Sequence, residues 1–402
     1  MNYAVRGARV ILPNDVVETD VIVADGRIAE IGAVQADETI DARGRVLAPA
    51  LIDIHGDAFE RQNMPRPNVF FPMDAAVLET DRQLAGNGIA TAYHALTLSW
   101  EPGLRAVDRG AAFVDAIERL APRCLVENRI QLRWETFAFE ARELITRVLN
   151  GALTPSLAFN DHTSMTMRSF DIAIQDRAFE HSPAFAALDP EDPRLVQKRS
   201  GASRRAGLSP EDYARRLLEV WERRPEVPDV IRSVADEARA VGAPMLSHDD
   251  TQEETRDFYR AIGAPISEFP MRVPVAKSAR DAGDAIVFGA PNAVRGGSHI
   301  GSPSAADMVE DGLCDILASD YFYPAMLAAV SRLHDEMRAP LPALWSLVSA
   351  GPADALGLSD RGRIAPGQRA DLVLLDWPDD AIPAVSATIV GGRMAYQANA
   401  SC

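Results

Sequence analysis

The sequence predicts an α/β protein in which a (β/α)8 TIM-type barrel carries a small β-sandwich domain formed by the N- and C-terminal segments. Through the middle of the chain, short apolar runs alternate with helical patterns. Both ends show strand and hairpin patterns instead. A length of 402 residues, 47% of them hydrophobic, suits one barrel of about 250 residues with insertions and a small additional domain.

The two ends of the chain are expected to fold together. Strand patterns lie at residues 8–12, 20–24 and 28–31, and again at 372–376, 387–390 and 394–396. We assign residues 1–46 and 362–402 to the small β-sandwich domain and residues 47–361 to the barrel.

Eight runs are predicted to be the barrel strands, at residues 47–54, 89–98, 129–134, 156–160, 243–247, 265–268, 285–288 and 315–319. Helical patterns between them, such as residues 75–85 and 230–241, predict parallel strands joined by right-handed crossovers. Residues 163–228 are too long and too charged for an ordinary βα connection. They predict a helical insertion that serves as solvated surface, subunit contact or substrate lid.

Metal-binding residue types follow several of these strands. His55 and Asp57 point to the same side of the first strand, because alternate residues of a strand share a face. Later strands lead to Glu135, His162, His248 and Asp320. A single histidine at a strand end is more often structural, but active-site residues of these barrels collect at the carboxyl ends of the strands. Five coinciding strand ends predict a metal centre.

The ligand types limit the metal. Mixed imidazole and carboxylate donors without cysteine suit Zn²⁺ best, with Mn²⁺ or Fe²⁺ as alternatives, and the set is large enough for one or two ions. The two lysines, Lys198 and Lys277, do not end predicted strands. A bridging ligand would therefore be a carboxylate, and Glu135 is the candidate.

Composition excludes several classes of partner. A net charge of −17 disfavours binding to nucleic acid or to an anionic membrane. The three cysteines, Cys124, Cys314 and Cys402, lack disulfide or zinc-knuckle spacing and are expected to be reduced. The first residues form no apolar signal segment, and no apolar run approaches ~20 residues, so we expect a cytoplasmic protein.

Two segments, Pro49–His55 and Gly362–Val373, resemble the amidohydrolase superfamily. More narrowly, the chain resembles the alpha-D-ribose 1-methylphosphonate 5-triphosphate diphosphatases of the carbon–phosphorus lyase pathway of phosphonate metabolism. The matching segments are His55-Gly56-Asp57, Pro65-Arg66-Pro67, Asp161-His162-Thr163, Ser247–Thr251, Gly289–Asn292, Val294–His299 and Ser319-Asp320-Tyr321.

The chain departs from this pattern at two places. Gly56 stands where the family usually has threonine, and Ser164-Met165-Thr166 replaces the usual Pro-Gly-Gln. These departures concern the identity of the substrate more than metal binding, so a related phosphorylated substrate is also open.

The resemblance implies metal ligation by His55, Asp57, His162, His248 and Asp320, with Glu135 bridging. It implies attack of a metal-activated hydroxide on the α-phosphorus and release of pyrophosphate. In this reaction Asp320 would shuttle the proton and His299 would donate to a phosphate or leaving oxygen.

A phosphate site is expected after the seventh strand. Arg295 offers a guanidinium fork, and Gly296, Gly297 and Ser298 would expose backbone N–H groups to the phosphates, although a simple glycine-rich turn is an equal reading of the local sequence. The complete set of predicted substrate-binding residues is Arg66, Asn292, Arg295, Gly296, Gly297, Ser298 and His299.

Two other functions stay open at this point. The same metal chemistry would hydrolyse a non-peptide C–N bond, as in other members of the superfamily. A metal-free binding scaffold is the second alternative. The expected partner is a phosphorylated small molecule, with homo-oligomer formation as a further possibility.

Overall fold

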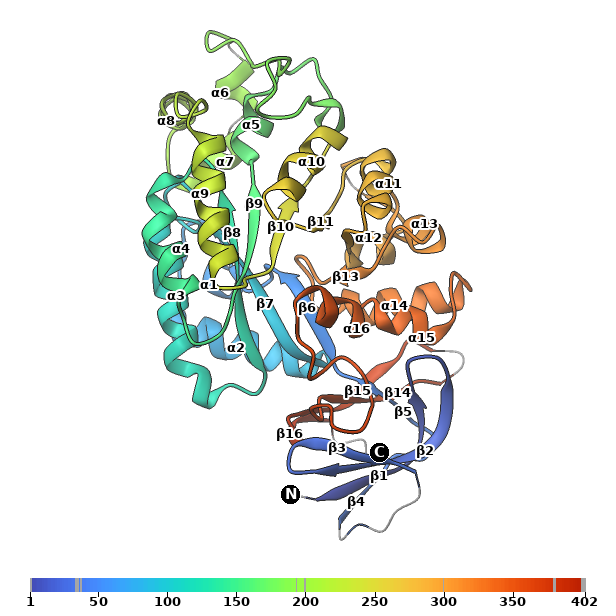
Figure 1. Cartoon of the computed structure of the whole chain (residues 1–402). Helices are drawn as coiled ribbons and strands as arrows, with labels where there is room; N and C mark the ends of the chain where they lie inside the picture. Colours follow the sequence, from blue (N-terminus) through green and yellow to red (C-terminus); the bar gives the residue numbers. More distant parts are fainter. Residues whose placement is uncertain are drawn as a thin grey trace.

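The computed structural model describes residues 2–32, 36, 38–192, 194–198, 200–298, 300–378 and 381–398. Two eight-stranded sheets organise the chain. The middle of the chain forms a barrel, and the blue N-terminal and red C-terminal strands lie together in a small domain below it (Figure 1). The predicted α/β fold class, a TIM-type barrel with a small β domain built from both ends, is confirmed.

All eight predicted barrel strands are present. They are β6 (Leu51–Gly56), β7 (Ile89–Leu98), β8 (Glu127–Glu135), β9 (Ser156–Asn160), β10 (Met245–His248), β11 (Ile266–Glu268), β12 (Ala285–Gly289) and β13 (Ile316–Ala318). Neighbours in this order pair in parallel. Their carboxyl ends therefore meet at one rim.

The barrel closes between β13 and β6 through a short seam. The N–H of Asp320 donates to the carbonyl of His55, and the N–H of Asp57 donates to the carbonyl of Asp320, both at 2.9 Å. Below them, the buried Asp53 carboxylate accepts the Ser319 hydroxyl at 2.5 Å and the Ser319 N–H at 3.0 Å. Burial raises the pKa of Asp53.

Helices surround the barrel because their apolar faces pack on the outer sides of the strands. They are α1 (Glu60–Asn63), α2 (Met73–Gly86), α3 (Val107–Leu120), α4 (Arg142–Leu149), α9 (Val227–Ala240), α10 (Glu253–Ala261), α11 (Val273–Asp281), α12 (Ala290–Arg295), α13 (Ala305–Glu310), α14 (Ala325–Asp335), α15 (Leu341–Ser346) and α16 (Ala350–Ala355). Short 3-10 turns lie at Ala121–Arg123, Phe139–Ala141 and Ile174–Asp176.

Apolar side chains fill the lower interior of the barrel. Ile54, Tyr93, Leu246, Ile266 and Val287 belong to one buried cluster contributed by five strands. The interior is thus a packed core, and polar side chains gather where the strands end.

The long connection after β9 is helical, as the sequence predicts. It contains α5 (His162–Met167), α6 (Arg194–Lys198), α7 (Ser200–Ala206) and α8 (Pro210–Trp221). Ser209 caps α8 by accepting the Asp212 N–H. This insertion lies at the top of the molecule in Figure 1, away from the small domain.

The small domain is one sheet of mixed pairing that packs around its own apolar cluster. Its strands are β1 (Tyr3–Ile11), β2 (Val16–Ala24), β3 (Arg27–Ile31), β4 (Glu38–Asp41), β5 (Val46–Pro49), β14 (Leu372–Asp376), β15 (Ala384–Val390) and β16 (Arg393–Gln397). β1 carries a register shift between Val5 and Ala8, and it pairs with β4 on one side of this shift and with β5 on the other.

The predicted strand at residues 47–54 is divided between the two sheets. β5 pairs with β1 and β14 in the small domain, and β6 opens the barrel. The Ala50 N–H still donates to Asp371 in the small domain, whereas the Leu51 N–H donates to Gly88 in the barrel. A continuous apolar run gives no sign of this change of partner, so the transition lies at Ala50 rather than after residue 46.

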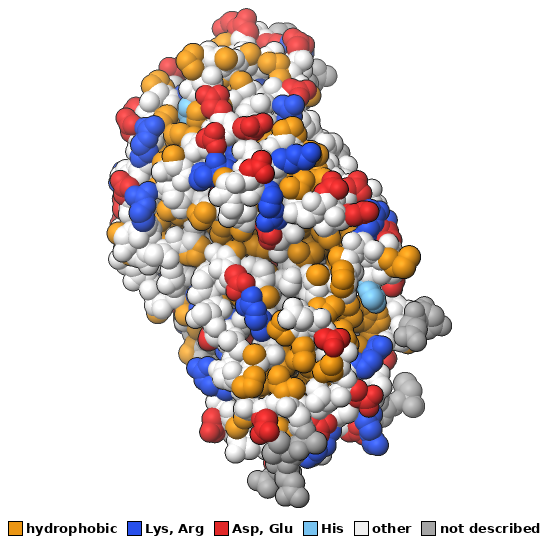
Figure 2. Space-filling model, turned by 45° about the vertical axis from the view of Figure 1, so that its right-hand side comes forward, with side chains coloured by type: hydrophobic (Ala, Val, Ile, Leu, Met, Phe, Trp, Pro, Cys, Tyr) orange, Lys and Arg blue, Asp and Glu red, His pale blue; other side chains and the backbone are white. Residues whose placement is uncertain are grey.

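The surface carries both signs of charge. On the face shown in Figure 2, red acidic and blue basic side chains are intermixed. Many exposed arginines pair with a nearby carboxylate, as Arg215 does with Asp212 at 2.8 Å. None of the helices in the described ranges combines the length and the apolar character that a membrane span requires.

An ion cluster fastens the small domain to the amino ends of the barrel strands. Glu127, at the start of β8, contacts Arg129 at 2.6 Å, Arg361 at 3.0 Å and Arg369 at 2.6 Å. Burial opposes the charged carboxylate, but the three arginines outweigh it and lower the pKa of Glu127 to about 2.

We expect Glu127→Gln to lower the free energy of unfolding by about 2 kcal/mol at pH 7, because the arginines lose their common partner. The folded-state pKa is depressed, so this stability is present above the ordinary value of 4.5 and is lost as the pH falls towards 2. Denaturant unfolding at pH 7 and pH 4 measures both effects. Glu79→Gln, which removes an exposed pair with Arg82, should change stability by less than about 0.5 kcal/mol. Equal stability of wild type and Glu127→Gln at pH 7 would contradict the assignment.

Candidate metal centre

The predicted ligand residues converge at the carboxyl rim of the barrel. His55 and Asp57 lie at the end of β6, His248 ends β10 and Asp320 follows β13. His162 is the first residue of α5, and Asp161 fixes it there because its side chain accepts the Ser164 N–H and hydroxyl, both at 2.7 Å.

Each of the three histidines holds a carboxylate with its Nδ1 atom. The Nδ1 atoms of His55 and His248 lie 3.0 Å and 2.7 Å from the two oxygens of Glu268. Nδ1 of His162 lies 2.5 Å from Glu135. An ionised carboxylate accepts a hydrogen bond, so it fixes the proton on Nδ1 and leaves the Nε2 lone pair for another partner.

The Nε2 atom of His55 lacks such a partner within the described ranges. This atom is fully buried. Burial lowers the pKa of His55, but the charges of Glu268 and Asp320 outweigh it and the net pKa is raised. The local field therefore favours positive charge beside this ring.

Three groups of possible ligand atoms are close enough to hold an ion. They are His55, Asp57 and Asp320; His162, His248 and Asp249; and His55, His248 and Glu268. The third group consists of the Nδ1 contacts just described, so the first two are the candidate metal sites. Imidazole nitrogens and carboxylate oxygens with carboxylate support behind them fit a divalent transition metal.

Asp320 is poised between protonation states. Burial and the neighbouring charge of Asp57 raise the pKa of Asp320 to about 6. Its backbone is also held at a φ of 54°, and Asp249, at the end of β10, has a φ of 59°. Positive φ values cost a non-glycine residue about 1 kcal/mol or more, and they concentrate at functional sites.

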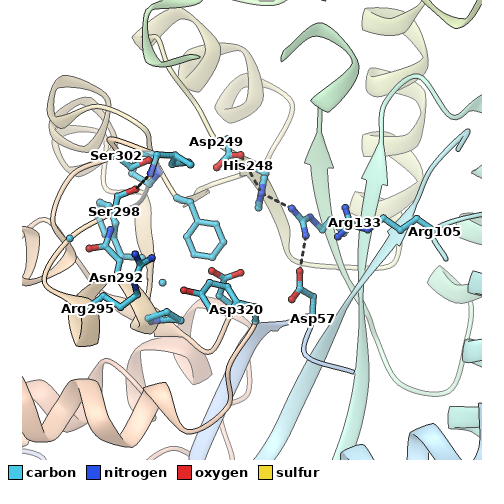
Figure 3. Close-up of a pocket in the computed structure, with 18 residues that line it drawn as sticks. Asp57, Arg105, Arg133, His248, Asp249, Asn292, Arg295, Ser298, Ser302 and Asp320 are labelled. Atoms are coloured by element: carbon cyan, nitrogen blue, oxygen red, sulfur yellow. Dashed lines mark hydrogen bonds and ion pairs between the residues drawn. The ribbon is translucent and has the colours of Figure 1, made fainter. Parts of the chain in front are cut away.

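A cavity of about 230 Å³ opens beside these residues. Figure 3 shows His248 and Asp249 on one side, Asp320 and Asp57 below, and Arg295, Asn292, Ser298 and Ser302 gathered at the opposite wall. A second chamber of about 160 Å³ lies beside His162 and is lined by Trp100, Glu101 and, from the insertion, Tyr213. Arg105 lines both spaces.

Arg133 reaches into the centre of the site. Its Nη1 atom donates to Asp57 at 3.3 Å, its Nη2 atom lies 3.0 Å from Nε2 of His248, and its Nε atom donates to Asn160 at 3.0 Å. Figure 3 shows the guanidinium between Asp57 and His248. Its side chain is 9% exposed, so the guanidinium is enclosed by the residues of the site.

Glu135 lies behind His162. One oxygen accepts from the imidazole and the other accepts the His162 N–H at 3.1 Å. Burial raises the pKa of Glu135, but the contacts with His162 lower it by more. The resulting pKa is about 2. The carboxylate that lies between two histidines is Glu268, and Glu135 is absent from the three ligand groups found among the described residues. Its bridging role stays a prediction.

The glycine-rich loop after α12 does not have the conformation that a phosphate site requires. The N–H groups of Gly296 and Gly297 both donate to the carbonyl of Asn292 and cap α12. They do not form the anion cradle that the sequence predicts, because the end of the helix uses these donors. The glycine-rich turn, which the sequence left equally open, is what the structure shows.

The other members of that loop have mixed positions. Arg295, Ser298 and Asn292 line the cavity. Both ends of the Asn292 amide are used, since it donates to Pro303 at 2.9 Å and accepts from Ala305 at 3.0 Å. His299, predicted as a catalytic donor, lies outside the described residues. Arg66 is exposed and is not among the residues that line the cavity.

The structure explains the first departure from the family pattern and shows where the second one lies. A Cβ atom on Gly56 would lie 2.5 Å from the Asp53 carboxylate and 3.0 Å from the Ser319 hydroxyl, so the seam leaves no room for a side chain. Ser164 is fully buried against Asp161. Gly56 is thereby part of the barrel closure, and Ser164 helps to fix the start of α5.

Sequence reasoning missed Glu268, Arg133 and Arg105. Glu268 ends the sixth predicted strand as the other ligands end theirs, which was a usable signal. Arg133 stands two residues before Glu135 on β8 and so shares its face. Arg105 lies in a loop after β7 and is held by both oxygens of Glu60, a contact without a sequence pattern.

Comparison with known proteins decides the family. Residues 179–396, more than half of the chain, match the family model described as amidohydrolase family. The chain belongs to the amidohydrolase family. It is a metal-dependent hydrolase, as members of this superfamily use one or two divalent metals and the residues at the rim fit them.

Among amidohydrolases, the chain is 30% identical over 385 residues to the alpha-D-ribose 1-methylphosphonate 5-triphosphate diphosphatase of Escherichia coli (strain K12), covering 94% of this chain and 96% of that protein. It is 27% identical to an adenine deaminase of Methylobacterium sp. (strain 4-46), covering 100% of this chain but 59% of the deaminase.

Solved structures share the fold of this amidohydrolase. The L-hydantoinase (dihydropyrimidinase) of Arthrobacter aurescens has a TM-score of 0.63 at 14% identity, with 98% of this chain and 96% of that chain covered. The dihydropyrimidinase of Brevibacillus agri NCHU1002 has a TM-score of 0.62, also at 14% identity, with coverages of 99% and 95%.

We expect Glu268→Gln to weaken metal binding about 10- to 100-fold, because an amide would present a donor to one Nδ1–H group and would remove the charge that supports both histidines. Competition with a chelator of known affinity measures the change. Glu60→Gln removes a nearby carboxylate that pairs with Arg105 and should leave affinity within about twofold. Unchanged affinity in Glu268→Gln would show that the two histidines do not depend on this carboxylate.

Proposed function

We propose that this chain hydrolyses alpha-D-ribose 1-methylphosphonate 5-triphosphate, or a related 5-triphosphate, and releases pyrophosphate. The proposal rests on how the charged side chains are distributed around the cavity. Metal-ligating side chains occupy one wall, and Arg295 stands at the other without a hydrogen bond or ion pair to any described residue. A substrate with a reacting phosphorus and an anionic tail fits this arrangement, and the diphosphatase relative supports it.

The ion would be held by the predicted ligands at the rim. His55, Asp57 and Asp320 form one group, and His162 and His248 belong to the other. Zn²⁺ is the ion we propose, with Mn²⁺ or Fe²⁺ as substitutes. When bound, a divalent ion supplies a Lewis acid that activates water near neutral pH and polarises the scissile phosphoryl group.

The chain's own residues supply the other parts of the reaction. Asp320, at the candidate ion site, would accept the proton of the attacking water and return it to the leaving oxygen. Arg133 presents a buried positive charge to the reacting phosphoryl group. Arg295 binds the oxygens of the tail, because a guanidinium matches phosphate geometry with two parallel donors.

The net charge of −17 does not oppose an anionic substrate at this site. Exposed charges are screened beyond a Debye length of about 8 Å at physiological salt, whereas the arginines lie in the cavity wall itself. A cytoplasmic location and a phosphorylated small molecule as partner are part of this proposal.

Hydrolysis of a non-peptide C–N bond is the second candidate. The likeness to an adenine deaminase, which covers all of this chain and 59% of the deaminase, favours it, since a metal-activated water also attacks a carbonyl or amidine carbon. A neutral heterocycle, however, gives no role to the guanidinium of Arg295.

The first test is pyrophosphate release from ribose 5-triphosphate compounds and nucleoside triphosphates by the Zn²⁺- or Mn²⁺-loaded protein. We expect release by the wild type, with the 5-monophosphate as co-product, and a rate at least about 100-fold lower in Asp320→Asn. Parallel assays follow ammonia release from adenine and ring opening of dihydrouracil. Activity there, with metal bound and no pyrophosphate formed, would transfer the assignment to C–N hydrolysis.

We expect Arg295→Ala to raise KM for the triphosphate about tenfold or more with a smaller change in kcat, because the residue contacts the tail rather than the reacting group. Arg66→Ala removes another exposed arginine, one outside the cavity lining, and should change KM by less than twofold. Steady-state kinetics on both variants checks this. A larger effect at Arg66 than at Arg295 would contradict the placement of the tail.

A further inference from the structure

Arg133 occupies the space between the two candidate ligand groups. It contacts Asp57, a member of the group with His55 and Asp320, and it contacts His248, a member of the group with His162 and Asp249. The positive charge of Arg133 therefore lies between the two candidate metal sites.

A hydrogen bond to the neighbouring strand holds the guanidinium in this position. Its Nε atom donates to the Oδ1 atom of the fully buried Asn160 on β9. The Asn160 amide is fixed in turn by donation to the Ala158 carbonyl at 3.2 Å. All three guanidinium nitrogens of Arg133 therefore have a partner: Asn160, Asp57 and His248.

The two contacts of Arg133 differ in what they leave available for a metal. His248 has one lone pair on Nε2, since Glu268 fixes the proton on Nδ1, and the Arg133 N–H uses that lone pair at 3.0 Å. Asp57 uses only its Oδ2 atom, and a carboxylate has about four acceptor sites. Nε2 of His55 is buried and unpartnered among the described residues.

We propose that Arg133 takes the place of a second metal ion, so that this chain binds a single divalent ion on His55, Asp57 and Asp320. The group of His162, His248 and Asp249 stays closed to metal because Arg133 uses His248. The inference rests on the metal dependence within the proposed function and not on the substrate. The predicted number of ions can therefore be wrong while pyrophosphate is released, and it can be right while no pyrophosphate is released.

The experiment counts bound metal in the full-length protein. The wild type and each variant are stripped with chelator, exposed to excess Zn²⁺ and desalted. The number of Zn²⁺ ions per chain is then measured by inductively coupled plasma mass spectrometry. We expect one ion in the wild type and two in Arg133→Met, which keeps the side-chain length and frees His248. Arg105→Gln removes another arginine of the same cavity, one that pairs with Glu60, and should keep one ion.

Two histidine variants test the position of the ion even if Arg133→Met does not fold. We expect His55→Ala to lose the ion and His248→Ala to keep it. Loading with Mn²⁺ adds an independent readout, because two neighbouring ions give an exchange-coupled electron paramagnetic resonance spectrum, and we expect this only in Arg133→Met. A coupled pair in the wild type, or loss of the ion in His248→Ala with retention in His55→Ala, would overturn the proposal.

Discussion

The buried carboxylate of Asp53 is the contact on which the rest of the structure depends. It joins the first and last strands of the barrel through Ser319, at a place where the described residues form one isolated backbone bridge, between Gly56 and Asp320. The same seam sets Asp320 beside His55 and Asp57. Closure of the barrel therefore also brings His55, Asp57 and Asp320 together, and Gly56 has no side chain because the seam occupies the space.

Two further carboxylates extend this principle to the histidines. Glu268 supports His55 and His248 together, and Glu135 supports His162. The burial of Glu268 would be costly for an isolated charge, but its two imidazole partners hold its pKa well below the usual range. These carboxylates orient imidazoles that come from different elements of the chain, so the protein itself positions the ligands.

Much of this architecture could be predicted from the sequence, because the strand period of two and the βα alternation report local structure directly. These patterns identified the eight barrel strands and the ligand-type residues after them. Other features depend on contacts between distant segments. The division of the run at Ala50 depends on which strands pair with it, the donors of Gly296 and Gly297 depend on how α12 ends, and the position of Arg133 depends on Asn160 and His248. No local pattern encodes such partners.

The second chamber has a consequence for how this protein can diversify. Part of its wall, including Tyr213 and Ala202, comes from the insertion after β9, which contributes no barrel strand. The residues of the seam lie elsewhere in the chain, and of the candidate metal ligands only His162, at the start of α5, belongs to this insertion. Substitutions at Tyr213 and Ala202 can therefore change the shape of one chamber, and with it the substrates that enter, while the barrel strands and the seam keep their sequence.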